Sequence, residues 1–205
     1  MAKILWNVNY PGIYIRTNVW GKHSSFFHTT MTALNTISSK PVGKGLLRSI
    51  ASISAMRDGA VRVTITAKKG GGSSESPEDS NKSLAIKQSG NTFMKYTAGE
   101  GTSCTVNWDY NKLVCDGVQR PPFIALAHEL IHALHDIHGA SYRAYSGKLK
   151  DNSGAAEEEA RTVGLGPHVD EPITENKIRA EHNLALRPSY SGHYFTNVTN
   201  SWDDA

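Results

Sequence analysis

The chain of 205 residues is long enough to bury one substantial core or two very small ones. Its net charge of +3 and charged fraction of 20% are ordinary for a globular protein. Lys and Arg are scattered, which argues against a nucleic-acid interface. No apolar run approaches the length of a membrane span. Residues 1–11 lack the basic-then-apolar pattern of a secretory signal peptide.

Hydrophobic periodicity in the first half predicts short strands and two helices. Val61, Val63 and Ile65 alternate with polar residues, which is typical of a half-buried strand. Pro41 and Gly43 separate two helical patterns. We expect strands at 13–19, 60–67, 92–97 and 102–108, and helices at 26–37 and 44–54.

The segment at about 68–83 has the composition of a mobile loop. It contains three successive glycines, Gly70 to Gly72, followed by Ser, Glu, Pro, Asp and Asn. Such residues bury too little apolar area to offset the entropy of ordering the chain. We therefore expect the segment to stay mobile. The strand at 102–108 beyond it is expected to line the cleft and to pair with an extended substrate.

The two cysteines, Cys104 and Cys115, are too few for a disulfide scaffold. If residues 112–115 complete a hairpin with the strand at 102–108, the two thiols face each other and a bond is feasible. Two free, half-buried thiols are the alternative, which a reducing compartment favours. The sequence leaves this choice open.

The second half changes to a helical character. A helix is expected at 122–138, because Pro121 and Pro122 mark its start and Gly139 its end. After a polar loop at 141–154, a second helix follows at 155–163. Thr174 is a plausible N-cap for a third at 175–183. The expected fold is α+β, with a small mixed sheet packed on the 122–138 helix.

The 122–138 helix carries the pattern His-Glu-x-x-His. His128 and His132 lie four residues apart, so both imidazoles project from one face and can reach one zinc ion. Zinc lowers the pKa of water to around 7, and Glu129 lies where it can take the proton. The alternative is a helix with two surface histidines. An apolar stripe argues against it: Ile124, Ala127, Leu130, Ile131 and Leu134.

His135 and His138 continue the helix near the same face. Either is a ligand in principle. The sequence after Gly139, however, lacks the third histidine that the metzincin motif places there. We therefore expect both to be partly exposed.

A catalytic zinc takes three protein ligands and keeps one position open. The acidic cluster that starts at Glu157 is the candidate for the third ligand. Successive helical residues point about 100° apart, so one carboxylate of the three faces the metal squarely. Glu159 lies on the apolar side of its helix, with Ala156 and Val163, which favours it. The alternative is a solvated acidic helix start that complements the macrodipole.

The motifs together resemble a known family. The blocks 127–133 (AHELIHA), 158–164 (EEARTVG), 174–176 (TEN) and 187–190 (RPSY) occur in this order. They resemble the NleD-like effector metalloproteases, which include type III secretion effectors and relatives among polymorphic toxins. They are also similar to the catalytic light chain of clostridial neurotoxins. The resemblance covers about 101–190, while the first hundred residues match loosely.

The resemblance implies a zincin-like protease fold over 1–205 as a single domain. It implies a Zn²⁺ site with Glu129 as the base. The implied ligands are His128, His132 and Glu159. The implied supporting residues are Glu158 and Glu175 behind the ligands, one of them orienting a ligand histidine, and the oxyanion-stabilising pair Arg187 and Tyr190. A guanidinium and a phenol are suitable donors to such an oxyanion.

The expected function is a zinc-dependent endopeptidase, delivered by a specialised bacterial system into a target-cell cytoplasm to cleave one protein. The resemblance points to a host signalling kinase as substrate, and we expect a monomer. One alternative is a housekeeping or regulatory zinc peptidase in its own cytoplasm. Another is a metal-binding interaction module without catalysis. Intact Glu129, Arg187 and Tyr190 argue against this last one. The sequence names neither substrate nor delivery route, and leaves open whether the chain belongs to a larger toxin.

Overall fold

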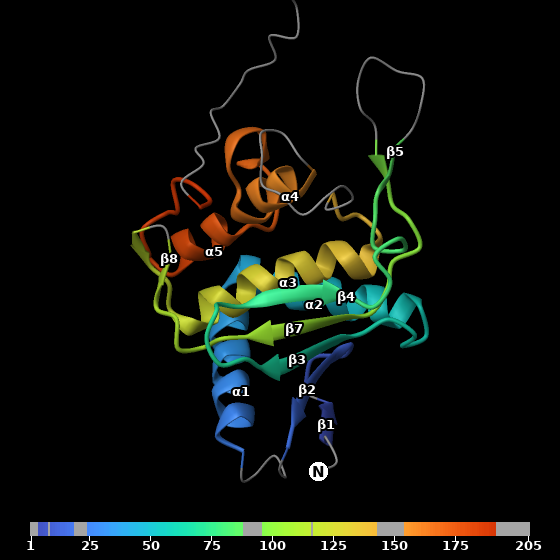
Figure 1. The fold of residues 1–205 in the computed structure, drawn as a ribbon, viewed down its shortest axis with the longest axis horizontal. Coiled ribbons are helices and arrows are strands. Elements are labelled where there is room, and N and C mark those ends of the chain that lie inside the picture. The colour runs from blue at the N-terminus through green and yellow to red at the C-terminus, as the bar shows by residue number, and fades with distance from the viewer. Residues whose placement is uncertain are drawn as a thin grey trace, which may run out of the picture.

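The computed structural model describes most of the chain and shows a twisted sheet with helices along one side (Figure 1). The described residues are 4–7, 9–18, 24–87, 96–115, 117–142 and 154–191. Most of the strand expected at 92–97, and most of the loop expected at 141–154, lie outside these ranges.

Helices form at the five places where the sequence predicts them. They are α1 (Ser25–Ser38), α2 (Pro41–Met56), α3 (Pro122–His138), α4 (Gly154–Val163) and α5 (Glu175–Glu181), with a short 3-10 turn, η2, at Gly166–His168. Helix α2 begins three residues earlier than expected, because Pro41 occupies its first turn and proline is tolerated there. Within the described part of the chain, none of the helices has both the length and the apolar character to cross a membrane.

The main sheet has the strand order β1-β2-β3-β7-β4. Its strands are β1 (Ile4–Asn7), β2 (Ile13–Thr17), β3 (Val63–Ala67), β4 (Ser74–Pro77) and β7 (Cys104–Trp108). The three inner strands are parallel to one another, while β1 and β4 at the two edges run antiparallel to their neighbours. Two small ribbons pair β5 (Ile86–Lys87) with β6 (Tyr96–Thr97), and β8 (Val114–Cys115) with β9 (Val118–Gln119).

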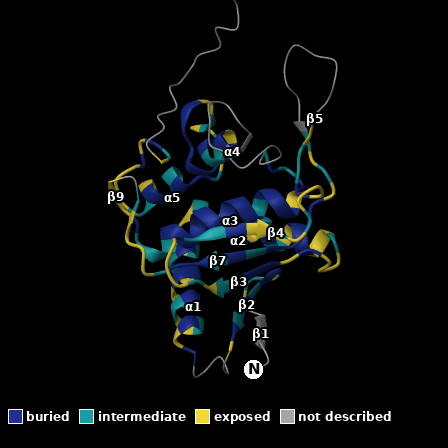
Figure 2. Ribbon diagram, in the orientation of Figure 1, coloured by how far each residue is buried: buried dark blue, intermediate teal, exposed yellow. Residues whose placement is uncertain are grey.

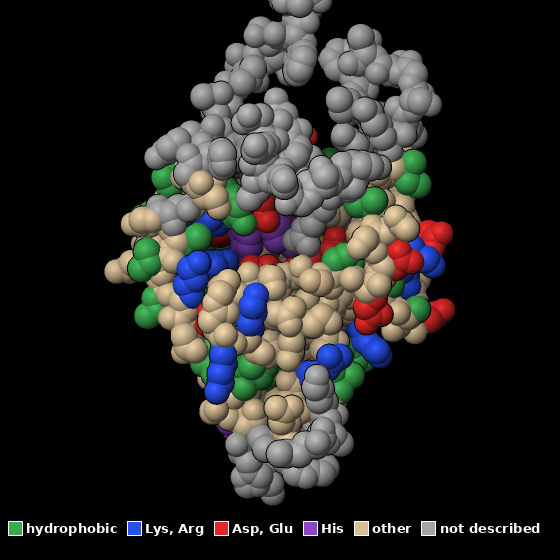
Figure 3. Space-filling view, in the orientation of Figure 1, with side chains coloured by type: hydrophobic (Ala, Val, Ile, Leu, Met, Phe, Trp, Pro, Cys, Tyr) green, Lys and Arg blue, Asp and Glu red, His purple; other side chains and the backbone are tan. Residues whose placement is uncertain are grey.

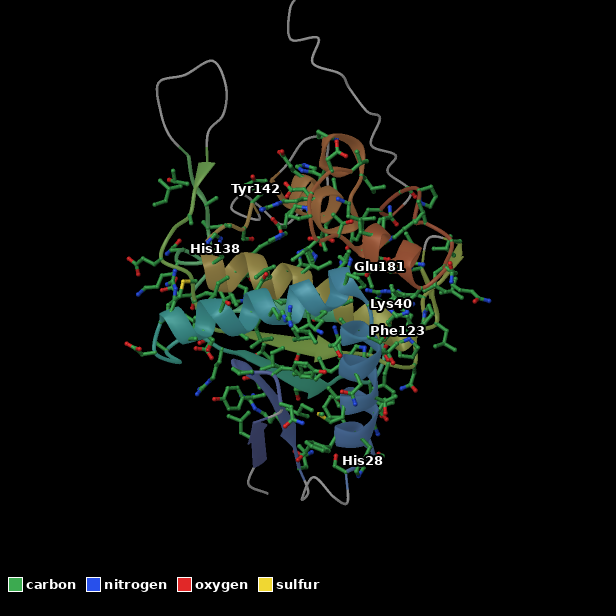
Figure 4. All side chains as sticks on the ribbon, turned by 180° about the vertical axis from the view of Figure 1, so that it is seen from behind. His28, Lys40, Phe123, His138, Tyr142 and Glu181 are labelled. Atoms are coloured by element: carbon green, nitrogen blue, oxygen red, sulfur yellow. The ribbon has the colours of Figure 1, made fainter. Side chains whose placement is uncertain are left out.

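The core lies between the sheet and the first three helices. Along β7, Cys104, Val106 and Trp108 are fully buried, while the residues between them are half-buried. This alternation shows that one face of the sheet packs against α3. Seen from behind, α1 and α2 lie in front of the sheet (Figure 4), and buried residues concentrate in α3 and the central strands (Figure 2).

Helix α3 is buried on its polar side as well as its apolar side. The predicted apolar stripe is buried except at Leu134, which is half-buried. His128, Glu129 and His132 are also at most 5% exposed. Charged and titratable side chains are rarely buried without partners, so the polar face of α3 needs partners from the segments that cover it.

A carboxylate on α5 joins this helix to the start of α2. Glu181 on α5 accepts hydrogen bonds from the backbone amide of Val42 at 2.9 and 3.0 Å. Glu181 thereby caps the first turn of α2, whose own N-cap residue, Lys40, makes no side-chain cap. Figure 4 shows Glu181 and Lys40 close together at this junction.

Two expectations for the region before α3 are wrong, and one open choice is decided. The strand at 102–108 does not form the cleft edge, because β7 is paired with β3 on one side and β4 on the other. The segment at 68–83 contains strand β4, whose backbone hydrogen bonds to β7 order it despite its polar composition. The choice that the sequence left open for the cysteines is decided by β8, which pairs with β9 and not with β7. Cys104 and Cys115 are therefore free thiols, the first buried and the second half-buried.

Gly139 offers a test of how α3 is held. Its φ of +72° is left-handed, and an added Cβ would lie 2.6 Å from the carbonyl carbon of Gly99. Gly59, with φ of +74° and no atom within 4 Å, is the matched control. Both alanine variants are strained, but Gly139→Ala also overpacks, which costs about 1–3 kcal/mol more. Urea denaturation should show this gap, and equal losses would contradict the packing described.

Candidate active site

The side chains of His128 and His132 on α3 converge with that of Glu159 on α4. The Nε2 atoms of His128 and His132 lie 3.2 Å apart. Glu159 Oε2 lies 3.2 Å from the first of these nitrogens and 3.1 Å from the second. The three atoms thus form a nearly equilateral triangle, with Glu159 reaching it from α4. The histidines are almost fully buried, while the Glu159 side chain is 19% exposed.

The triangle has the dimensions of a tetrahedral zinc site. Zinc bonds to nitrogen and oxygen of about 2.0–2.1 Å place neighbouring ligands about 3.3 Å apart in a tetrahedron. The two Nδ1 atoms face carboxylates, which fixes the tautomer that leaves each Nε2 as an acceptor. Three acceptor atoms so close together repel one another unless a cation lies between them. The residues present therefore fit a zinc ion.

Buried carboxylates orient both histidines. Glu175 Oε2 lies 2.8 Å from His128 Nδ1, and Glu158 Oε1 lies 3.2 Å from His132 Nδ1. The sequence led us to expect one such contact, and the structure shows two. The hydroxyl of Thr162 lies 3.1 Å from the same nitrogen of His132. Each imidazole is thereby clamped on the side opposite the triangle.

Adjacent residues of α4 act on opposite nitrogens of one ring. Glu159 faces His132 Nε2 and Glu158 faces His132 Nδ1. Glu158 is fully buried, where burial alone would raise its pKa, yet His135 and His132 hold the pKa well below its usual value. Glu157, the first member of the cluster, points away and is exposed. The three glutamates therefore have three different environments within one helical turn.

His135 was expected to be partly exposed, and this is wrong. It is 8% exposed, and its Nδ1 lies 2.6 Å from Glu158 Oε1. Burial lowers the pKa of its imidazole, which favours a neutral ring that donates to the carboxylate. Glu158 Oε2 in turn accepts from the backbone amide of Tyr142 at 2.9 Å. His138, one turn further, is exposed as expected.

Helix α5 supplies Glu175 and a partner that we did not predict, Arg179. Thr174 caps the helix as expected, accepting from the Lys177 amide at 3.2 Å. Arg179 Nε donates to Glu175 Oε1 at 2.6 Å, and both side chains are fully buried. Their i,i+4 spacing is visible in the sequence and could have suggested the pair. Burial would raise the Glu175 pKa, but His128 and two arginines hold it below its usual value.

Arg187 and Tyr190 lie against this network. Arg187 Nη1 donates to Glu175 Oε2 at 3.1 Å, and its guanidinium lies 4.6 Å from the centre of the Tyr190 ring. The Tyr190 ring is parallel to that of His128, with 6.1 Å between centroids. Burial and the carboxylates of Glu159 and Glu129 raise the pKa of the phenol, so it stays protonated and able to donate.

Glu129 is the remaining residue of the motif and is 5% exposed. Its Oε1 lies 3.7 Å from Nη2 of Arg120, a buried side chain that precedes α3. Sequence reasoning missed Arg120, because nothing in the pattern before Pro121 distinguishes it from a surface arginine. In the space-filling view, histidine and acidic side chains are visible in a hollow between the sheet and the C-terminal helices (Figure 3).

Comparisons with known proteins agree with this geometry. The family model Peptidase_M91, described as effector protein, matches residues 16–190. A comparison with curated proteins found no match. Among solved structures, the chain is similar to the crystal structure of botulinum neurotoxin type G light chain. The TM-score is 0.51 at 13% sequence identity, over 95% of this chain and 81% of that chain.

These findings confirm the expected fold class and the expected resemblance to an effector family. The likeness to the neurotoxin light chain supports the α+β, zincin-like fold predicted from the sequence. The family match extends from within β2 to Tyr190 and so includes strands β3, β4 and β7 of the sheet as well as the site. The chain belongs to the Peptidase_M91 family of effector proteins.

Proposed function

We propose that this protein is a zinc-dependent endopeptidase, delivered into a target cell to cleave a specific protein. The observation that carries the proposal is the triangle of His128 Nε2, His132 Nε2 and Glu159 Oε2, each pair of atoms within 3.2 Å. Glu129 follows His128 on α3 and Tyr190 stacks on the His128 ring, which supports them as the proposed base and donor.

In this proposal His128, His132 and Glu159 hold the zinc. Zinc, when bound, supplies Lewis-acid polarisation of water and of the scissile carbonyl. The carboxylate of Glu129 takes the proton from the attacking water and later passes it to the leaving amine. Because Glu129 is buried on the same helix as both histidines, α3 holds the proposed base and two proposed ligands together.

Arg187 and Tyr190 are proposed to stabilise the oxyanion that forms on the attacked carbonyl. Tyr190 stacks beside His128, and burial keeps its hydroxyl protonated. Arg187 is fixed at its backbone by Asn176, which accepts from its amide at 2.8 Å and donates to its carbonyl at 3.0 Å. Preorganised donors of this kind typically lower a barrier by about 3–4 kcal/mol.

The substrate is proposed to pair with strand β4. Within the described residues, β4 is an edge strand of the main sheet with β7 on one side only. It packs beside α3, which carries the motif. An extended peptide added to this edge gains main-chain hydrogen bonds without demanding a particular sequence. This proposal replaces the pairing with residues 102–108.

The effector family suggests that the protein acts inside a host cell on a protein substrate. We propose that residues 1–205 form a single protease domain and act as a monomer. A signalling kinase is the substrate class that the sequence resemblance suggests. Type III secretion is the route suggested by the same resemblance.

The two adjacent carboxylates of α4 should fail differently. Glu159→Gln removes a proposed zinc ligand and should lower zinc affinity sharply. Glu158→Gln disturbs the orientation of His132 and should cost about 10- to 100-fold in affinity or activity while keeping zinc under ordinary dialysis. Glu157→Gln, at an exposed neighbouring position, is the matched control and should change neither. Zinc content after dialysis against a chelator checks all three.

Circular dichroism shows whether each of these variants remains folded. The assignment is reversed if folded Glu158→Gln loses its metal while Glu159→Gln retains one zinc per chain.

The role of Glu129 is tested by removing its charge. Glu129→Gln should keep zinc and fold but lose most activity, because it removes the base and no ligand. The measurement is the mapping of new protein N-termini after incubation of a host-cell lysate with wild type or variant. N-termini made only by the wild type identify the substrate. Unchanged proteolysis by the variant would show that another group activates the water.

A further inference from the structure

Arg120 is a buried cation beside the proposed base. It lies between β9 and α3 and is 5% exposed. Its Nη2 is 3.7 Å from Glu129 Oε1, which is close enough for an ion pair but too far for a hydrogen bond. Its Nε is buried without a hydrogen-bond partner. The guanidinium thus lies beside the proposed base with its Nε donor unsatisfied and with no side-chain hydrogen bond to Glu129.

The two other arginines around the site differ from Arg120. Arg179 donates to Glu175 Oε1 at 2.6 Å and to two backbone carbonyls. Arg187 donates to Glu175 Oε2 at 3.1 Å. A guanidinium has five donors and stays charged, so its burial is costly unless acceptors surround it. Within the described residues, Arg120 alone among the three has an ion partner but no side-chain hydrogen bond.

The backbone around Arg120 is held firmly. Its amide donates to the carbonyl of Leu113 at 2.7 Å. The preceding residue, Gln119, accepts from Arg179 Nη1 at 2.8 Å, which joins this segment to the Glu175 network. On the other side, the carbonyl of Pro122 accepts from Trp108 Nε1 at 3.1 Å. Such anchoring suits a group whose position must be maintained for a ligand.

We propose that Arg120 is a specificity-determining residue that binds the carboxylate of an aspartate or glutamate next to the scissile bond. This inference rests on the proposed function. A carboxylate matches the forked donors of a guanidinium and supplies the acceptors that Arg120 lacks. Because Arg120 contacts the base Glu129, the residue that it binds directly flanks the reacting carbonyl.

The positive charge of Arg120 disfavours other substrate side chains at the position next to the scissile bond. A lysine or arginine at this substrate position would bring a second cation against a buried one. An apolar side chain would leave the Nε donor of Arg120 unsatisfied, and a neutral amide would offer it only a weaker, uncharged acceptor. Lys and Arg side chains also gather beside the hollow that shows the histidines (Figure 3). An acidic residue satisfies the guanidinium and is attracted by its surroundings.

The first test is a cleavage profile. Zinc-loaded wild type is incubated with a proteome-derived peptide library, and Asp and Glu should be enriched at one of the two positions that flank the cut. In Arg120→Gln, kcat/KM should fall about tenfold or more for acidic peptides, as for loss of a charge-assisted hydrogen bond, and change little for their Asn or Gln counterparts. Arg48→Gln, an exposed site on α2, is the control.

Arg120→Lys is a second variant that tests the proposal even if Arg120→Gln does not fold. Lysine keeps the positive charge but lacks the paired, planar donors of a guanidinium, so this variant should retain a weaker preference for acidic peptides. Wild-type cuts without acidic enrichment would overturn the proposal whatever the variants do. An equal fall in kcat for all peptides in Arg120→Gln would also overturn it, since Arg120 would then only position Glu129.

A binding measurement separates this inference from the proposed function. Calorimetry on the zinc-loaded protein compares the α-hydroxamates of glutamate, glutamine and lysine, which chelate zinc and place a side chain beside it. Glutamate hydroxamate should bind about tenfold more tightly than the glutamine compound, and Arg120→Gln should abolish the difference. Equal binding of all three refutes the role of Arg120. Binding of none, together with no peptide cleavage, refutes the zinc peptidase.

Discussion

Two buried carboxylates orient the histidines of the site. Glu158 accepts a hydrogen bond from His132 Nδ1 and Glu175 accepts one from His128 Nδ1, and the arrangement of the site follows from these contacts. With those nitrogens engaged, both Nε2 atoms face each other and Glu159 as acceptors. Three such groups remain close only if a cation offsets their repulsion. Burial raises the pKa of both carboxylates, but His135 and His132 lower it for Glu158, and His128, Arg187 and Arg179 lower it for Glu175, so both pKa values lie below their usual value. Metal binding and this charged network are therefore expected to depend on each other.

The architecture shows why these partners come from distant parts of the chain. Helix α3 fills the space above the sheet with its apolar side and turns a row of polar residues the other way. That row is buried by α4, α5 and the segment that carries Arg187, each of which contributes charges to match it. The chain after α3 thus supplies the partners for the polar face of this helix. Strand β4 lies alongside α3 at the sheet edge, so the substrate pairing and the catalysis that we propose would meet at the same helix.

The sequence predicted those features that depend on local spacing. The i,i+4 histidines, the proline start and glycine end of α3, and the Thr174 cap all follow from rules that act within one or two helical turns. Features that depend on tertiary contacts were missed. Strand β4 is polar and glycine-flanked, so only its pairing with β7 makes it a strand. In the sequence His135 and Arg120 look like surface residues, but the fold buries both, and His135 contacts Glu158 of α4.

The central claim is that one zinc ion lies between His128, His132 and Glu159. It is tested most directly by anomalous diffraction from crystals of the zinc-loaded protein, measured on both sides of the zinc absorption edge. We predict a single anomalous peak at about 2.0–2.1 Å from both Nε2 atoms and from a Glu159 oxygen. His132, His135 and Glu158 form a second group whose ligand atoms lie within 4.8 Å of one another. A peak at that group instead, or no peak on α3, would contradict the account.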